Sequence, residues 1–299
     1  MSGFSLKKTM HALALAASAA AAMAALSLSA RAQEAGRIVS IGGSVTEIVY
    51  ALGDGDRLIA RDQTSIYPRE ALELPDVGYI RRLSPEGVLS VNPDLVIALE
   101  GYGPPEAKEV LTSAGVPIVE IPEAYDGDGI LTKIRETAKA LGREAEGEKL
   151  AASVKADLEQ AEAAAAKVEN PARVLFVLAL RDGRIMAAGG NSHAQAIIEM
   201  AGAENALSGF DGYKPVTDEA VLEAAPDVIL MMDRGIDTDH DATDAALFAL
   251  PAIAATPAGK NHALVRMGGQ YLLGFGPRTA EAARDLSDRL AEFTAGGSN

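Results

Sequence analysis

A tyrosine and an arginine in one short stretch are the residues of this chain best suited to chemistry at a metal. Tyr79 and Arg81 lie two positions apart and follow Gly78, which marks a loop. A tyrosine oxygen can ligate a hard metal cation once it ionises, but the ordinary pKa of tyrosine is about 10. A guanidinium close by favours the phenolate and keeps its own proton at neutral pH. The simpler alternative is a half-buried loop tyrosine whose hydroxyl is solvated.

Loops at the ends of predicted strands carry the other candidate binding residues. Short apolar runs predict strands at residues 37–41, 58–62, 95–99 and 117–121, and the first of them is expected to be buried. Ser44, Tyr67, Tyr79 and Tyr102 lie in the loops that follow these runs. Ligands of open α/β sheets bind beyond the carboxyl ends of the strands. We therefore expect these side chains near a ligand site, with Tyr67 as the main rival of Tyr79.

Ser44 is the candidate nucleophile of a competing interpretation, an exported α/β hydrolase. It follows Gly42-Gly43, but the sequence around it matches neither G-x-S-x-G nor the spacing of a phosphate-binding loop. Ser44 and Glu47 instead fit a capping box, which predicts a helix with Ser44 as its N-cap. The sequence contains no other evident pairing of a nucleophile with a base, so we expect a binding protein and not an enzyme.

A long helical stretch divides the chain into two halves. Residues 144–168 are rich in alanine, glutamate, lysine and leucine and contain no proline, which predicts one long helix. Strand and helix patterns alternate on both sides of it. The predicted fold is therefore α/β, with two similar lobes of mostly parallel sheet, one bridging helix and a ligand cleft between the lobes. The predicted units are residues 33–141 for the first lobe, 142–170 for the bridging helix and 171–299 for the second lobe.

One segment of the first half recurs in the second. Glu86 is followed by Val-Leu and by Pro93-Asp94, and Glu219 is followed at the same spacing by Val-Leu and by Pro226-Asp227. The offset is 219 − 86 = 133 residues. Junctions of this kind also recur for local reasons, because proline ends a helix. The repeat nevertheless supports two similar lobes.

A glycine-rich segment near the C-terminus, residues 268–279, is predicted to be a loop. It brings Tyr271 towards the cleft, whereas Phe275 is expected to pack in the core. A closing helix is predicted from about residue 280 to residue 293.

The N-terminus has the pattern of a secretory signal peptide. Lys7 and Lys8 precede an alanine- and leucine-rich run, and Ala30-Arg31-Ala32 follows as a cleavage signal. We expect residues 1–32 to be removed near Ala32 and the mature protein to be periplasmic. The full chain has a net charge of −15, which disfavours nucleic acid as a partner. It contains no cysteine, so neither a disulfide nor a lipid-modified cysteine is available.

Two motifs give the chain a specific resemblance. They are Leu-Pro-Asp-Val-Gly-Tyr-Ile-Arg-Arg-Leu-Ser at residues 74–84 and Leu-Leu-Gly-Phe-Gly-Pro-Arg-Thr at residues 272–279. With the repeated glutamate segments, they make the whole mature chain resemble the periplasmic haem-binding proteins of bacterial ABC haem importers. Those proteins are part of a helix-bridged class that also binds cobalamin and iron–siderophores, and these are the alternative ligands.

The resemblance implies roles for individual residues. Tyr79 would ligate the iron of haem b, the transported ligand, and Arg81 would support it. Tyr67, Tyr102 and Tyr271 would contribute to the same site, and His193 could approach from the second lobe as another ligand. Glu86 and Glu219 would pair with arginines on an inner-membrane permease that works with its ATPase. We expect the protein to act as a monomer.

Overall fold

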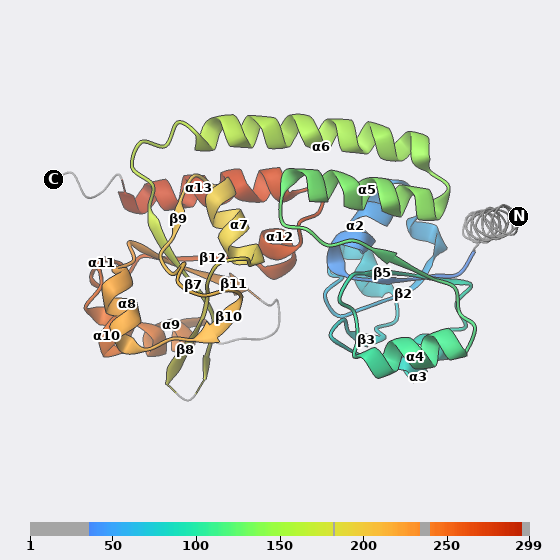
Figure 1. Ribbon diagram of the computed structural model, residues 1–299, viewed down its shortest axis with the longest axis horizontal. Coiled ribbons are helices and arrows are strands. Elements are labelled where there is room, and N and C mark those ends of the chain that lie inside the picture. The colour runs from blue at the N-terminus through green and yellow to red at the C-terminus, as the bar shows by residue number, and fades with distance from the viewer. Residues whose placement is uncertain (1–35, 182, 234–239, 295–299) are drawn as a thin grey trace, which may run out of the picture.

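The computed structural model describes residues 36–181, 183–233 and 240–294, so the predicted signal peptide lies outside the described residues. Two α/β halves lie beside each other, and helices run along one side of both (Figure 1). The longest is α6 (Glu144–Ala165), which follows α5 (Gly127–Leu141). None of the described helices is both long and apolar enough to cross a membrane.

The first half contains a wholly parallel four-stranded sheet in the order β2-β1-β5-β6. Its two central strands are buried along their whole length, as expected of strands covered on both faces, and apart from Ser40 they consist of aliphatic residues. The strands are β1 (Ile38–Ile41), β2 (Leu58–Arg61), β5 (Leu95–Leu99) and β6 (Ile118–Ile121). The helices that precede α5 are α2 (Gly43–Ala51), α3 (Pro85–Ser90) and α4 (Pro105–Ser113).

The second half contains a mixed sheet in the order β10-β8-β7-β11-β12, with β9 paired to β7. Strands β7, β11 and β12 are parallel, whereas β8 and β10 are antiparallel to their neighbours. The strands are β7 (Arg173–Arg181), β8 (Arg184–Ala188), β9 (Glu204–Asn205), β10 (Tyr213–Pro215), β11 (Val228–Asp233) and β12 (Leu264–Gly268). The helices are α7 (His193–Met200), α8 (Asp218–Ala224), α9 (His240–Phe248), α10 (Pro251–Ala254), α11 (Pro257–Lys260), α12 (Gly269–Leu273) and α13 (Thr279–Thr294). The predicted α/β class is confirmed.

The repeated segments form the same local structure in both halves. The Asp94 backbone N–H donates to Arg37 O at 2.9 Å, and the Asp227 N–H donates to Arg173 O at 2.8 Å. Each arginine also turns its guanidinium onto carbonyl groups at the end of the repeated helix. Arg37 donates to Val91 O, and Arg173 donates to Ala224 O. The two acceptors are 224 − 91 = 133 residues apart, which is the offset of the sequence repeat.

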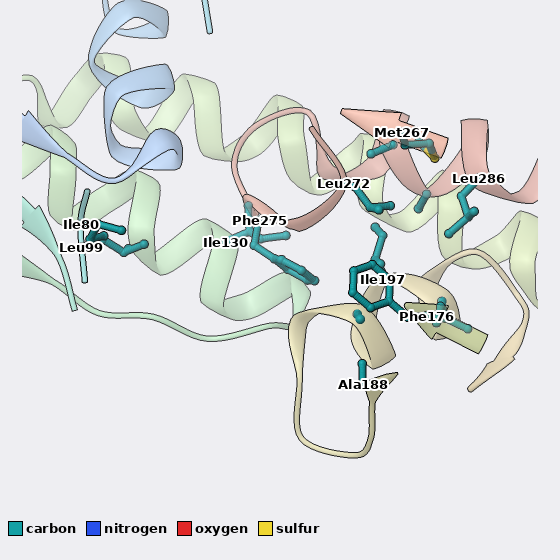
Figure 2. Close-up of a cluster of buried hydrophobic side chains, with 14 of the residues drawn as sticks. Ile80, Leu99, Ile130, Phe176, Ala188, Ile197, Met267, Leu272, Phe275 and Leu286 are labelled. Carbon is teal, nitrogen blue, oxygen red and sulfur yellow. The ribbon is translucent and has the colours of Figure 1, made fainter. Parts of the chain in front are cut away.

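The hydrophobic core continues from one half into the other. One cluster of buried side chains contains residues of both sheets. Figure 2 shows Ile80 and Leu99 at one end of the cluster, Phe275 near its middle and Phe176 and Leu286 at the other end. Phe275 is 1% exposed, as expected from the sequence. The junction between the halves is therefore packed and is not only a covalent link.

Two predictions of local structure are wrong. Helix α2 begins at Gly43 with Gly42 as its N-cap, so Ser44 lies inside the helix and does not cap it. The Gly42 N–H donates instead to Asp62 Oδ1 at 2.8 Å, and the Gly43 N–H donates to Thr64 Oγ1 at 3.1 Å. These acceptors come from a distant loop, which local patterns do not reveal. The segment 268–279 is not all loop, because it contains α12.

Candidate ligand site and docking surface

Tyr79 lies on a short β-hairpin in the first half. Strand β3 (Gly78–Tyr79) pairs in antiparallel fashion with β4 (Arg82–Leu83), and Tyr79 lies opposite Arg82. The Tyr79 side chain is 39% exposed, whereas Ile80 in the turn and Leu83 after it are buried. The inward residues anchor the hairpin in the core, so the outward tyrosine has a defined position.

Hydrogen bonds from two other loops fix this hairpin. The Gln63 N–H donates to Gly78 O at 2.9 Å, and the Gly103 N–H donates to Ile80 O at 2.9 Å. Gly78 has a φ of +108°, which side-chain-bearing residues rarely adopt, and its N–H donates to Asp76 Oδ1 at 2.7 Å. Tyr79 is therefore held before any ligand arrives, which lowers the ordering entropy that binding must overcome.

Arg81 leaves the same hairpin and contacts the neighbouring loop. Its Nη1 donates to Gly101 O at 2.8 Å. Gly101 has a φ of +76°, and a Cβ at this position would collide with the Arg81 guanidinium. The glycine therefore makes room for the arginine. The Arg81 guanidinium thus hydrogen-bonds the Gly101 carbonyl group, and its predicted role of favouring the Tyr79 phenolate stays a prediction.

Exposed apolar side chains gather in the segment that includes both candidate tyrosine ligands. Seven large hydrophobic residues of the described chain are exposed, and Ile66, Tyr67, Leu72 and Tyr79 are four of them. Isolated apolar residues are common on protein surfaces, but several within one fixed segment indicate a binding surface. We call residues 66–79 the exposed apolar segment, although Arg69, Glu70, Glu73 and Asp76 are exposed in it as well.

Tyr67 contacts Arg278 of the second half, a contact that the sequence did not predict. The Arg278 guanidinium carbon lies 3.3 Å from the centroid of the Tyr67 ring. Arg278 also forms a bidentate ion pair with the buried carboxylate of Glu47, with Nε–Oε1 at 3.1 Å and Nη2–Oε2 at 2.9 Å. Arg278 lies in one of the two motifs that carry the resemblance, and Glu47 had been read as a capping residue. The sequence motif therefore points to Arg278, but it does not reveal that Arg278 contacts Tyr67.

A second charged group is buried where the two halves meet. The Lys133 side chain is fully buried, and its Nζ lies 2.7 Å from Glu123 Oε1 and 3.1 Å from Phe275 O. Burial lowers the pKa of the Lys133 ammonium, and Glu123 offsets part of that effect. Burial favours a higher pKa for Glu123, but the contacts with His193 and Lys133 outweigh it and lower the pKa.

His193 belongs to this junction. It is the first residue of α7, and its Nε2 lies 3.9 Å from Glu123 Oε2. Its ring centroid lies 4.2 Å from that of Tyr125 and 5.5 Å from that of Phe275. The His193 side chain is 20% exposed. A role as a second iron ligand would require these contacts to rearrange.

The remaining two candidate tyrosines, Tyr102 and Tyr271, are held by partners of their own. Tyr102 is 5% exposed, and Lys108 Nζ lies 4.2 Å from its ring centroid. The Tyr271 hydroxyl donates to Asp285 Oδ2 at 2.8 Å. Burial and this hydrogen bond raise the pKa of Tyr271 well above its ordinary value, which disfavours a phenolate. Both residues fit packing roles better than direct ligation.

Glu86 and Glu219 occupy equivalent exposed positions. Each is in the first turn of its helix, where Ser84 caps α3 and Thr217 caps α8. Hydrogen bonds from its own backbone N–H and from Thr217 lower the pKa of the Glu219 carboxyl. Helices α3 and α8 both lie away from α6, which runs along the opposite side of the molecule (Figure 1). Each half therefore carries one exposed glutamate on a helix that lies away from the bridging helix.

Comparisons with known proteins agree with this architecture. The model of the periplasmic binding protein family matches residues 38–271. The structure of the periplasmic heme-binding protein BhuT in complex with two hemes is 40% identical, with a TM-score of 0.80, and the match covers 86% of this chain and 98% of that one. The apo structure of the periplasmic heme-binding protein RhuT from Roseiflexus sp. is 39% identical, with a TM-score of 0.81 and the same coverage. A vitamin B12-binding protein of Vibrio campbellii is 30% identical over 204 residues, which are 68% of this chain and 73% of that protein.

Proposed function

The chain belongs to the periplasmic binding protein family, and from this premise we propose that it binds haem through Tyr79 and delivers it to the permease of an ABC importer. The observation that carries the proposal is the fixed, 39% exposed Tyr79 within an exposed apolar segment. A phenolate is a suitable axial ligand for ferric iron, and the apolar segment suits a porphyrin face. The similarity to BhuT and RhuT over 86% of the chain supports the same ligand class.

Cobalamin is the second candidate ligand, because vitamin B12-binding proteins are among the relatives. Cobalamin carries its own ligands at both axial positions of its cobalt, so it does not need a protein phenolate. Haem iron has open axial positions, and an outward tyrosine on a preformed hairpin can occupy one of them. The geometry of Tyr79 therefore favours haem over cobalamin.

A direct titration separates these ligands. The purified mature protein is titrated with hemin, with cyanocobalamin and with a ferric siderophore, and binding is followed by absorbance and by quenching of tyrosine fluorescence. We expect saturable binding of hemin with a ferric tyrosinate absorption band and no saturation by cyanocobalamin at the same concentrations. Saturation by cyanocobalamin alone would reassign the site.

Delivery to the permease would use Glu86 and Glu219. Charge reversal in the double variant Glu86→Lys/Glu219→Lys is expected to lower haem uptake by at least about tenfold, because like charges replace complementary ones at the docking surface. Hemin affinity should be unchanged. Glu162→Lys on α6 is the matched control, since that exposed acid lies on the opposite side of the molecule. Uptake is measured in cells that depend on this importer for iron, and a loss of hemin affinity in the double variant would contradict the docking role.

The proposed location is the periplasm, with a signal peptide cleaved near Ala32. An acidic, cysteine-free binding protein suits that compartment, because it needs no disulfide and interacts weakly with anionic membrane lipids. N-terminal sequencing of the mature protein checks the cleavage position.

A further inference from the structure

We infer that Arg278 and Gln270 are positioning residues, and that they orient the Tyr67 ring so that the planar ligand stacks on it. The inference rests on the proposed haem-binding function and adds to it a contact that Tyr79 does not supply. It gives two residues of the second half a role in shaping a surface of the first half.

The guanidinium of Arg278 is fixed before it meets the Tyr67 ring. Glu47 holds its Nε and Nη2 in a bidentate pair, and the Glu47 carboxylate is only 7% exposed. The ring of Tyr271 lies on another side, with its centroid 5.1 Å from the Arg278 guanidinium carbon. A guanidinium held in this way cannot rotate freely. Because its carbon lies 3.3 Å from the centroid of the Tyr67 ring, it also restricts the orientation of that ring.

The backbone next to Tyr67 is held by Gln270, another residue of the second half. Gln270 Oε1 accepts from the Ile66 N–H at 2.8 Å, and Gln270 Nε2 donates to Gly43 O at 2.8 Å. A Cβ at Gly43 would lie 2.9 Å from the Gln270 side chain and 2.6 Å from Thr64 O, so this close approach requires a glycine. One amide of the second half therefore bridges two backbone segments of the first.

The result is an aromatic ring with one face covered and a side chain that is still partly exposed. Arg278 covers one face of Tyr67, yet the residue is still 41% exposed. A macrocycle with an extended π-system stacks favourably on an oriented aromatic ring. Because the ring is already held by Arg278, binding costs little additional rotamer entropy. This arrangement selects flat aromatic ligands over ligands of other shapes.

The test is a double-mutant cycle on hemin affinity, with absorbance as the second readout. Tyr67→Leu should weaken hemin binding about tenfold while the tyrosinate band of the complex is kept, and Tyr67→Phe should restore the affinity because it retains the ring. Arg278→Lys should weaken binding about fivefold when Tyr67 is present and cause no further loss in Tyr67→Leu. Thermal unfolding of each apo variant monitors folding. If Arg278→Lys is unstable, Tyr67→Leu still tests the inference, because Tyr67 is 41% exposed and does not belong to the buried core.

Three outcomes would overturn the inference. Unchanged hemin affinity in Tyr67→Leu would show that the ring is not a ligand contact. If Arg278→Lys lowered hemin affinity equally with and without the Tyr67 ring, Arg278 would act only by linking the two halves and not through Tyr67. Loss of the tyrosinate band in Tyr67→Leu would make Tyr67 the ligand. Failure of the wild-type protein to bind hemin would instead reject the proposed function, which separates the two claims.

Discussion

Replacing Tyr79 with phenylalanine is expected to abolish the ferric tyrosinate absorption of the hemin complex and to weaken hemin binding by more than about hundredfold. Removing a residue that merely orients a metal ligand costs roughly 10–100-fold in affinity, so losing the ligand itself should cost more. The hairpin should survive the change, because the Tyr79 side chain is 39% exposed and its anchors are Ile80 and backbone hydrogen bonds. Absorbance titration with hemin measures both effects.

The variant Tyr67→Phe shows, in the same titration, whether Tyr67 and not Tyr79 is the iron ligand. The tyrosinate band is retained in this variant if Tyr79 binds the iron, and it disappears if Tyr67 does. Apo Tyr79→Phe should unfold at the temperature of the wild-type protein, which separates a lost ligand from a lost fold. A band that persists in Tyr79→Phe would refute ligation by Tyr79.

Lys133→Met is expected to destabilise the fold by about 3–5 kcal/mol, because it removes the ammonium group nearest to the buried Glu123 carboxylate and leaves only the longer contact with His193. The pair lies at the junction of the halves, where the side chains of Lys133 and Glu123 are 0% and 10% exposed. The Lys133 ammonium also donates to Phe275 O, so its loss frees a carbonyl group of the second half. Urea denaturation followed by circular dichroism measures the free energy of unfolding.

Two further variants test this explanation. Replacing both partners, in Lys133→Met/Glu123→Leu, should recover most of the lost stability, since an apolar pair of similar volume can replace a buried ion pair. The matched control is Lys108→Met, because the Lys108–Glu120 ion pair is exposed, with side chains 33% and 41% accessible, and should contribute less than about 1 kcal/mol. A cost of Lys133→Met no larger than that of the control would contradict the assigned role.

Much of the fold follows from local patterns in the sequence. The buried strands of the first half and helix α6 are where apolar periodicity and helix propensity predict them, and the repeat at Glu86 and Glu219 marks equivalent helices. The start of α2 differs from the prediction, because the N–H groups of Gly42 and Gly43 find acceptors on Asp62 and Thr64 and the helix begins one residue before Ser44. Contacts between segments distant in sequence decide such details.

In the candidate site, too, local features can be predicted from the sequence and contacts between distant segments cannot. Tyr79 and Arg81 are recognisable because their hairpin is continuous in sequence, and the structure shows how Ile80 anchors it. The clamp on Tyr67 could not be predicted, because Arg278 is 278 − 67 = 211 residues away. Lys133 and Phe275 are likewise joined only by the packing of the two halves. Chemistry within one loop is visible in the sequence, whereas the residues that position the loop are not.

The most direct test is the position of the iron in crystals of the hemin-bound mature protein, located by its anomalous X-ray scattering. We expect the iron peak at coordination distance from the Tyr79 hydroxyl oxygen, on the surface formed by the exposed apolar segment. An iron peak beside Tyr67 or His193, with Tyr79 left free, would contradict the assignment of the ligand.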